Sequence, residues 1–300
     1  MIQKKIKRKL YKLFHPAVGE ILMLHRVVEN RSVLEANRQM EITPEFLEVT
    51  LQNYQRKGYQ FVSLDEVYEI VSKQKRPKPK FVCFTFDDGY VDNYELAYPI
   101  FKKYNCPFAI YVTTDFPDGK ALLWWYRLEE ILLKNVQLRL SDGSEFNCST
   151  NENRNNAFKE IRNKIFSLQS DNMVKTLNEL FLPYTFDYDI ENKQVMSWKH
   201  IITLSKDQLC TIASHSISHS ALDWSTVNMM KREVIDSKYI IEKKINLPVL
   251  HFAYPYGRYN DNICKTILEA GYRTAVLANG DVERTDANII ILRRIVLIEK

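Results

Sequence analysis

Two adjacent carboxylates are the first residues in this sequence whose types and spacing could do chemistry. Asp87 and Asp88, followed by Gly89, come directly after the mostly apolar run Phe81–Thr85. That run is typical of a short buried strand, and the glycine permits a tight turn at its end. Burial of one carboxylate is costly, and a second beside it raises the pKa of at least one unless a cation is present. The alternative is a strand-end turn in which one aspartate caps the next helix.

Two histidines at a second predicted strand end are potential metal ligands. His215 and His219 enclose the sequence His-Ser-Ile-Ser-His after the apolar run Leu209–Ser214. If a helix begins in this turn, residues four apart point the same way, and the two imidazoles lie together. Two imidazoles and a carboxylate with an open fourth position form a catalytic site for zinc or a similar divalent ion. For the histidines taken alone, a surface turn is the alternative.

A third strand end carries the sequence Tyr254-Pro-Tyr256-Gly257 after Val249–Ala253. Functional groups gather at the carboxyl ends of strands in parallel α/β sheets and barrels. We therefore expect the three motifs to meet in space.

The elements that would position these motifs alternate regularly between strand and helix, which predicts βαβ units and a parallel sheet. Strands are predicted at Glu20–Val27, Phe81–Thr85, Phe108–Val112, Leu209–Ser214, Val249–Ala253, Thr274–Ala278 and Ile290–Ile298. Helices are predicted from Thr43-Pro44 to Gly58, Ser63 to Ser72, Asn93 to Tyr104, Trp198 to Lys206, Ser225 to Ile245 and Asn260 to Ala270.

The alternation stops over residues 118–191, where a mainly helical insertion is predicted. Helices are expected at Ala121–Lys134, Asn153–Gln169 and Asp171–Phe181, with a polar loop around Ser141–Glu152. The neighbouring aromatic residues Trp124, Trp125 and Tyr126 would form a helix core, with a sugar-stacking platform as the alternative.

Composition places the 300-residue chain among globular proteins, with 45% hydrophobic and 26% charged residues. The net charge of +5 is mild and does not indicate a nucleic-acid partner. Five scattered cysteines, never spaced as Cys-x-x-Cys, predict reduced thiols in a reducing compartment. No apolar stretch approaches the length of a membrane-spanning helix, and nothing in the composition indicates a protein partner.

Residues 1–18 predict a basic amphipathic helix ahead of a single catalytic domain at 19–300. Ile2, Ile6, Leu10 and Leu13 recur at helical spacing among lysines and arginines. Such a helix would contact an anionic membrane surface peripherally; the alternative is an apolar stripe packed on the protein body. Because the apolar core of a signal peptide is missing, we expect a cytoplasmic protein, with the inner face of the membrane as a further location.

The motifs Thr-Phe-Asp-Asp-Gly-Tyr at 85–90, His-Ser-Ile-Ser-His at 215–219 and Tyr-Pro-Tyr-Gly at 254–257 resemble those of the polysaccharide deacetylase family. This is carbohydrate esterase family 4, the NodB-homology domain. The resemblance covers most of residues 20–114 and 195–298 and leaves the insertion outside. It implies an α/β fold built as a distorted, incomplete (β/α) barrel. It also implies removal of N-acetyl, sometimes O-acetyl, groups from carbohydrates with one divalent ion: zinc, or else cobalt, nickel or manganese.

The resemblance also implies a role for each matching residue. Asp87 corresponds to the catalytic base, and Asp88, His215 and His219 correspond to the metal ligands. The backbone N–H of Tyr256 corresponds to the group that stabilises the oxyanion.

The sequence departs from the family pattern at two places. Ala253 stands where the third motif usually has an arginine, and Ile291–Leu297 holds no histidine to serve as general acid. His25, at the end of the first strand, is our leading candidate for the proton donor, with a core histidine as the alternative. Arg294 would orient Asp87 or bind substrate. We expect structural roles for the remaining histidines, His15, His200 and His251.

The leading hypothesis is a metal-dependent deacetylase of an N-acetylated glycan or lipid-linked sugar precursor in cell-envelope biosynthesis. The alternative is a catalytically weak carbohydrate-binding descendant, which the two departures support. A third hypothesis is hydrolysis of another non-peptide C–N bond, which would use the same residues. Retention of both aspartates and both histidines favours the deacetylase, because a binding protein has no need of a base beside a metal site.

Overall fold

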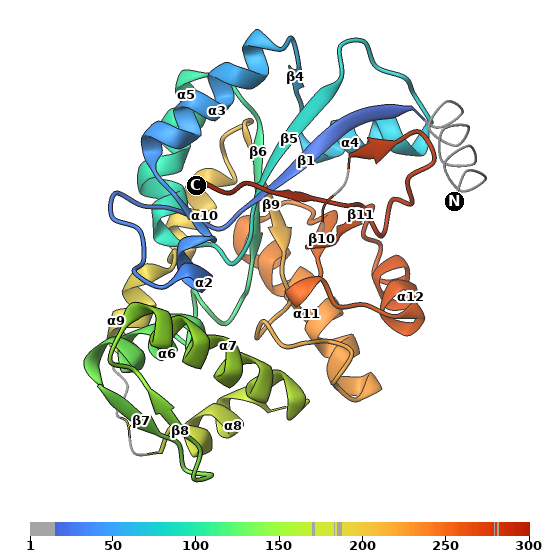
Figure 1. The fold of residues 1–300 in the computed structure, drawn as a ribbon. Helices are drawn as coiled ribbons and strands as arrows, with labels where there is room; N and C mark the ends of the chain where they lie inside the picture. Colours follow the sequence, from blue (N-terminus) through green and yellow to red (C-terminus); the bar gives the residue numbers. More distant parts are fainter. Residues whose placement is uncertain (1–15, 170–171, 183, 185–187, 279, 281) are drawn as a thin grey trace, which may run out of the picture.

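The computed structural model describes residues 16–169, 172–182, 184, 188–278, 280 and 282–300 (Figure 1). Nearly all of the predicted N-terminal helix, and His15, lie outside these residues. No described helix has the length and apolar character needed to cross a membrane.

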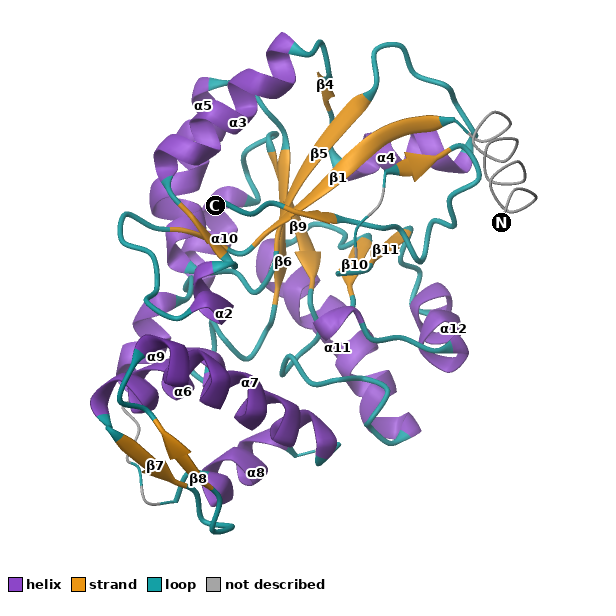
Figure 2. Ribbon diagram, viewed as in Figure 1, coloured by secondary structure: helices purple, strands orange, loops and turns teal. Residues whose placement is uncertain are grey.

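One curled, mostly parallel sheet forms the centre of the molecule (Figures 1 and 2), as the α/β barrel prediction requires. Its order is β11-β10-β9-β6-β5-β1-β12, with β4 beside β5 and β13 beside β1. Only β12 pairs antiparallel. The strands are β1 (Ala17–Leu24), β4 (Gln60–Phe61), β5 (Phe81–Phe86), β6 (Phe108–Val112), β9 (Cys210–Ser214), β10 (His251–Ala253), β11 (Thr274–Val276), β12 (Glu283–Arg284) and β13 (Ile295–Val296). A separate pair joins β2 (Arg26–Val27) to β3 (Glu41–Ile42).

Helices between the strands follow the predicted positions closely. They are α2 (Glu35–Arg38), α3 (Pro44–Arg56), α4 (Leu64–Ser72), η1 (Asn93–Ala97), α5 (Tyr98–Lys103), α10 (Trp198–Leu204), α11 (Val227–Ile245) and α12 (Asp261–Glu269). The predicted caps form, since the side chain of Thr43 accepts from the Phe46 N–H and Ser63 forms a capping box with Glu66. Of these helices, the short α2 was not predicted.

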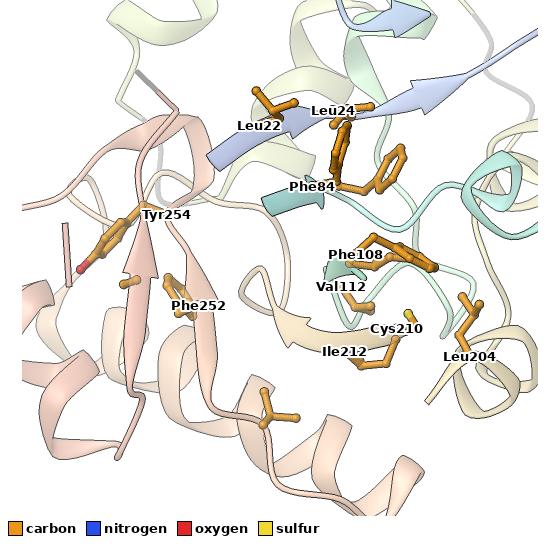
Figure 3. Packing of buried hydrophobic residues seen from close by; sticks show 14 of the residues in the cluster. Leu22, Leu24, Phe84, Phe108, Val112, Leu204, Cys210, Ile212, Phe252 and Tyr254 are labelled. Carbon is orange, nitrogen blue, oxygen red and sulfur yellow. The ribbon is translucent and has the colours of Figure 1, made fainter. Parts of the chain in front are cut away.

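The two faces of the sheet pack against different elements because side chains alternate along each strand. Val82, Phe84 and Phe86 of β5 face the larger core, which α3, α5, α10, α11 and α12 cover. Phe84, Phe108 and Ile212 lie in this core on three neighbouring strands (Figure 3). Phe81 and Cys83 face the barrel interior, which α4 covers.

The final segment of the chain differs from the predicted long strand at Ile290–Ile298. Leu292 pairs with β11, where its N–H bonds to the Ala275 carbonyl, and the Leu297 N–H bonds to the Met23 carbonyl on β1. The segment therefore crosses from one end of the curled sheet to the other and partly closes the barrel. Because it leaves β11 before it reaches β1, it does not form one long strand beside a single neighbouring strand. Arg294 lies between these two contacts.

The region predicted as an insertion folds around its own hydrophobic cluster, which includes Trp124, Leu128, Phe158 and Ile161. Its helices are α6 (Trp124–Lys134), α7 (Asn151–Ser167), α8 (Met173–Leu180) and α9 (Tyr188–Gln194), gathered at the lower left of Figure 1. The polar loop predicted at Ser141–Glu152 is in part the hairpin of β7 (Gln137–Arg139) and β8 (Glu145–Asn147). α9 was also not predicted.

Candidate active site

The strand period places the first aspartate of the pair inside the barrel. Asp87 follows Cys83 and Thr85 on the interior face, and its N–H continues the ladder by donating to the Leu24 carbonyl. Asp88 then adopts φ +73 and Gly89 φ +84, so the chain turns sharply, and both carboxylates lie within 4.0 Å of Nε2 of His215. Both aspartates are buried, at 3% and 2% exposure.

The histidine motif forms a turn, and the helix that would have aligned the two imidazoles does not begin there. Ser216 and His219 have φ +69 and +57, values that no α-helix contains. Glu233 of α11 holds this turn by accepting from the N–H groups of Ile217 and Ser218 at 2.8 and 3.0 Å and from the Ser218 hydroxyl at 2.7 Å. The His219 N–H donates to the Ser216 hydroxyl at 3.1 Å. The turn, rather than helical spacing, brings the two imidazoles together.

Asp88, His215 and His219 form a cluster whose ligand atoms lie within 4.8 Å of one another. The Asp88 Oδ1 is 3.3 Å from Nε2 of His219 and 3.6 Å from Nε2 of His215. Nδ1 of His215 lies 2.8 Å from the Ala253 carbonyl, which fixes its proton there and leaves Nε2 as a lone-pair donor. Among the described residues, the buried Asp88 Oδ1 has no hydrogen-bond donor. An orphaned carboxylate oxygen facing two imidazole nitrogens fits a divalent cation.

Electrostatics around the cluster favour a cation as well. Burial, followed by the charge of Asp87, raises the pKa of Asp88 to about 8. Burial also lowers the pKa of His215 and, still more, that of His219, so both imidazoles are neutral. Neutral imidazoles are the form that binds metal.

Asp87 is held by Arg294 in a bidentate ion pair at 2.6 Å for both contacts. Arg294 is fully buried, and its Nε donates to the Leu277 carbonyl at 2.9 Å. Burial raises the pKa of Asp87, but the charge of Arg294 outweighs it and keeps the pKa below the usual range. Of the two predicted roles for Arg294, its contacts match the orientation of Asp87.

Tyr256 adopts φ +58 in the short turn η2 (Pro255–Gly257). Its ring packs on His219 with centroids 4.6 Å apart, so the third motif does reach the cluster. Asp88, Ser216, His219 and Tyr256 thus all have positive φ, a strained backbone conformation that is common at functional sites.

His25 also lines the cavity above the cluster and follows β1, as predicted. Burial lowers the pKa of His25 to about 4, although the charge of Asp87 opposes this effect. The other two described histidines lie elsewhere: His200 accepts from the Ser197 N–H at the start of α10, and His251 contacts the Thr274 hydroxyl at 2.7 Å.

A cavity of about 460 Å³ opens above these residues. Apart from Arg162 of α7, the ionisable groups of the lining come from the barrel, whereas α2, α6 and α7 supply much of the remaining lining. Trp124 and Trp125 belong to the insertion core, as expected, and they line the cavity too. The core interpretation of these two tryptophans is therefore confirmed, and the sugar-stacking platform stays a prediction.

Sequence reasoning missed several residues that shape this site. Glu233 sits in a long amphipathic helix with no local sign of its contact to the histidine turn. Phe158, Arg162 and Phe166 of α7 recur every four residues and line the cavity. The four-residue spacing is visible in the sequence. Nothing in the sequence indicates that this side of the helix faces the cavity.

Comparisons with known proteins agree with this geometry. The polysaccharide deacetylase family profile matches residues 74–150 and 167–275. Hence the prediction that the whole insertion lies outside the resemblance is wrong, because only 151–166, most of α7, is skipped within the match. The protein YxkH of Bacillus subtilis (strain 168) is 23% identical over 280 residues, which is 93% of this chain and 71% of that protein.

Two solved structures share the fold. The Streptococcus pyogenes deacetylase PplD in complex with acetate has a TM-score of 0.64 and 21% identity, with 93% of this chain and 92% of that chain covered. IcaB from Ammonifex degensii has a TM-score of 0.61 and 15% identity, with 94% and 92% covered. Because the profile matches more than half of the sequence, the chain belongs to the polysaccharide deacetylase family of carbohydrate-directed hydrolases, which act on carbon–nitrogen bonds other than peptide bonds.

Proposed function

We propose that this protein is a metal-dependent deacetylase that hydrolyses an N-acetyl group of a carbohydrate to a free amine and acetate. The observation that carries the proposal is the Asp88, His215 and His219 cluster beside a carboxylate, Asp87, that Arg294 holds ionised. The mixed nitrogen and oxygen ligand set suits zinc best, with cobalt, nickel and manganese as alternatives.

When bound, a divalent cation would act as a Lewis acid toward the acyl oxygen and would make water more acidic. Asp87 is ionised and can accept the proton of the attacking water. Its bidentate pairing with Arg294 fixes the direction of its lone pairs. The N–H of Tyr256 is the proposed donor to the developing oxyanion, and one such donor is typically worth about 2.7–4 kcal/mol.

The departing amine must receive a proton, because an amide anion is too basic to leave. Protonated Asp87 would be a strong acid, since Arg294 lowers its pKa. His25 is neutral near pH 7, with a pKa of about 4, so it cannot serve as a resting acid. We propose that His25 relays to the amine the proton that Asp87 has accepted. Substitution His25→Gln should lower kcat more than it changes KM.

Acetate release tests the proposed reaction. Wild type, Asp87→Asn and His215→Ala would be incubated with N-acetylglucosamine oligomers and a lipid-linked N-acetylated sugar, and bound metal would be measured in each protein. We expect acetate from the wild type alone, and loss of metal in His215→Ala but not in a His200→Ala control. Metal-loaded wild type that released no more acetate than Asp87→Asn over both substrates would overturn the proposal.

The predicted domain arrangement and location remain proposals that rest on the sequence. Residues 1–18 would place the catalytic domain at an anionic membrane face, close to an envelope precursor. Removal of residues 1–14 should then reduce binding to vesicles that contain anionic lipid. Unchanged binding would refute this role.

A further inference from the structure

One face of α7 forms a wall of the cavity. Phe158, Arg162 and Phe166 are spaced by four residues, so they lie on the same side of the helix, and all three line the cavity. Phe158 is 2% exposed and anchors this face in the insertion core. The family profile skips residues 151–166, which hold all three side chains. The cavity wall formed by α7 is therefore a feature of this chain that the family profile does not include.

The wall connects directly to the candidate metal cluster. Phe166 packs edge-on against Tyr256 with centroids 5.2 Å apart, and Tyr256 packs on His219. Trp124 of α6 donates from Nε1 to the Tyr256 hydroxyl at 3.3 Å. A saccharide that reaches the cluster must therefore pass an aromatic surface, and aromatic rings with polar edges suit sugar rings.

Arg162 places a positive charge on that surface. Its guanidinium carbon lies 5.3 Å from the centre of the Phe166 ring, so the ring orients it. The side chain is exposed to solvent. Burial raises the pKa of Tyr256, and the charge of Arg162 opposes this rise.

Among the described residues, no carboxylate balances the charge of Arg162, whereas neighbouring charges are paired. Lys159 and Lys164 on the same helix contact Glu35 and Asp142. Arg258, also in the cavity lining, makes a bidentate contact with Asp223. Within the described part of the chain, no carboxylate lies within ion-pair distance of Arg162.

We propose that Arg162 determines specificity by binding an anionic substituent, a carboxylate or a phosphate, on the acetylated saccharide. Guanidinium groups match both oxyanions with paired N–H donors. The substituent would bind at the α7 wall while the N-acetyl group sits at the Asp88, His215 and His219 cluster. This inference rests on the proposed function and adds a substrate class to it: acidic N-acetylated saccharides.

Three matched substrates test the inference: N,N′-diacetylchitobiose, its 1-phosphate, and its analogue oxidised to a carboxylate at C6. Wild type, Arg162→Gln, Arg162→Lys and the control Lys159→Gln would be compared. A hydrogen bond to a charged group corresponds to about 10- to 100-fold in affinity. We expect wild type to favour at least one acidic substrate by about that factor in kcat/KM, mostly through KM. Arg162→Gln should abolish the preference, Arg162→Lys should restore part of it, and Lys159→Gln should keep it.

An equal preference in wild type and Arg162→Gln would overturn the inference, as would a wild-type preference for the neutral sugar. Release of acetate from none of the substrates would instead count against the proposed function. In that case the dissociation constants of the three deacetylated saccharides, measured by calorimetry, decide the role of Arg162. Weaker binding of only the acidic saccharides by Arg162→Gln supports it, and unchanged constants refute it.

Discussion

The ion pair between Arg294 and Asp87 should contribute measurably to stability, and Arg294→Met tests its size. Both side chains are buried, and two contacts of 2.6 Å join them. Removal of one partner leaves an uncompensated buried charge, which costs about 3–5 kcal/mol. In an Asp87→Asn background Arg294 is itself the uncompensated buried charge, and the same substitution removes it. There Arg294→Met should cost no more than about 1–3 kcal/mol for the lost donor to the Leu277 carbonyl, because relief of the unpaired charge offsets that loss.

Urea unfolding of the four proteins in chelator gives the double-mutant cycle directly. The expected coupling is at least about 2 kcal/mol. Arg293→Met, a change at the exposed neighbouring residue, should cost less than about 1 kcal/mol. The reasoning is refuted if Arg294→Met lowers the free energy of unfolding equally in the wild-type and Asp87→Asn backgrounds, because the ion pair would then contribute nothing to stability.

The pH dependence of the same variants gives an independent check with a definite sign. Because Arg294 keeps the folded pKa of Asp87 below its unfolded value, ionised Asp87 adds stability above that unfolded value. This contribution is lost as pH falls through the folded pKa. Without Arg294, burial raises the folded pKa instead, so Arg294→Met should regain stability relative to wild type as the pH is lowered from about 7 to 5. A difference between the two proteins that does not change with pH would contradict this.

Three further predictions follow from the contacts around the site. Glu233→Gln should loosen the histidine turn and lower metal affinity by about 10- to 100-fold, measured by competition with a chelating dye, while Asp236→Asn on the same helix should not. Tyr90→Phe removes the hydroxyl that accepts from Nε1 of buried Trp125, so urea unfolding should show a loss of about 1–3 kcal/mol. The free thiols of Cys83, Cys106 and Cys210 are buried with raised pKa values; a thiol reagent should react with them only in denaturant, and rapid reaction of the native protein would contradict the packing.

The sequence predicted the central residues of the site because their signals are local. A period of two along Phe81–Phe86 is enough to put Asp87 on the interior face. The two histidines were predicted to lie together if a helix began in the turn. They do lie together, but in a turn with positive φ at Ser216 and His219 that Glu233 holds from a separate helix. Arg294, the partner of Asp87, is 207 residues away in the sequence. The segment that carries it has the sequence pattern of an ordinary strand, so nothing local predicts that Arg294 points at Asp87.

The departure at Ala253 therefore has a different meaning in the structure than in the sequence alone. The family resemblance implies an arginine there, and its replacement supported the alternative of a weak carbohydrate-binding descendant. Yet Ala253 is buried on the interior face of β10, where its carbonyl still fixes His215 and its small side chain leaves the interior to other residues. Arg294 lies on the C-terminal segment that crosses in space from β11 to β1, and its guanidinium points into that interior and pairs with Asp87. A buried charge of this kind is costly unless it is paired, and its pairing with the proposed base keeps that base ionised. Arg294 therefore supplies the guanidinium that Ala253 lacks, and this removes one of the two arguments for the weak carbohydrate-binding alternative.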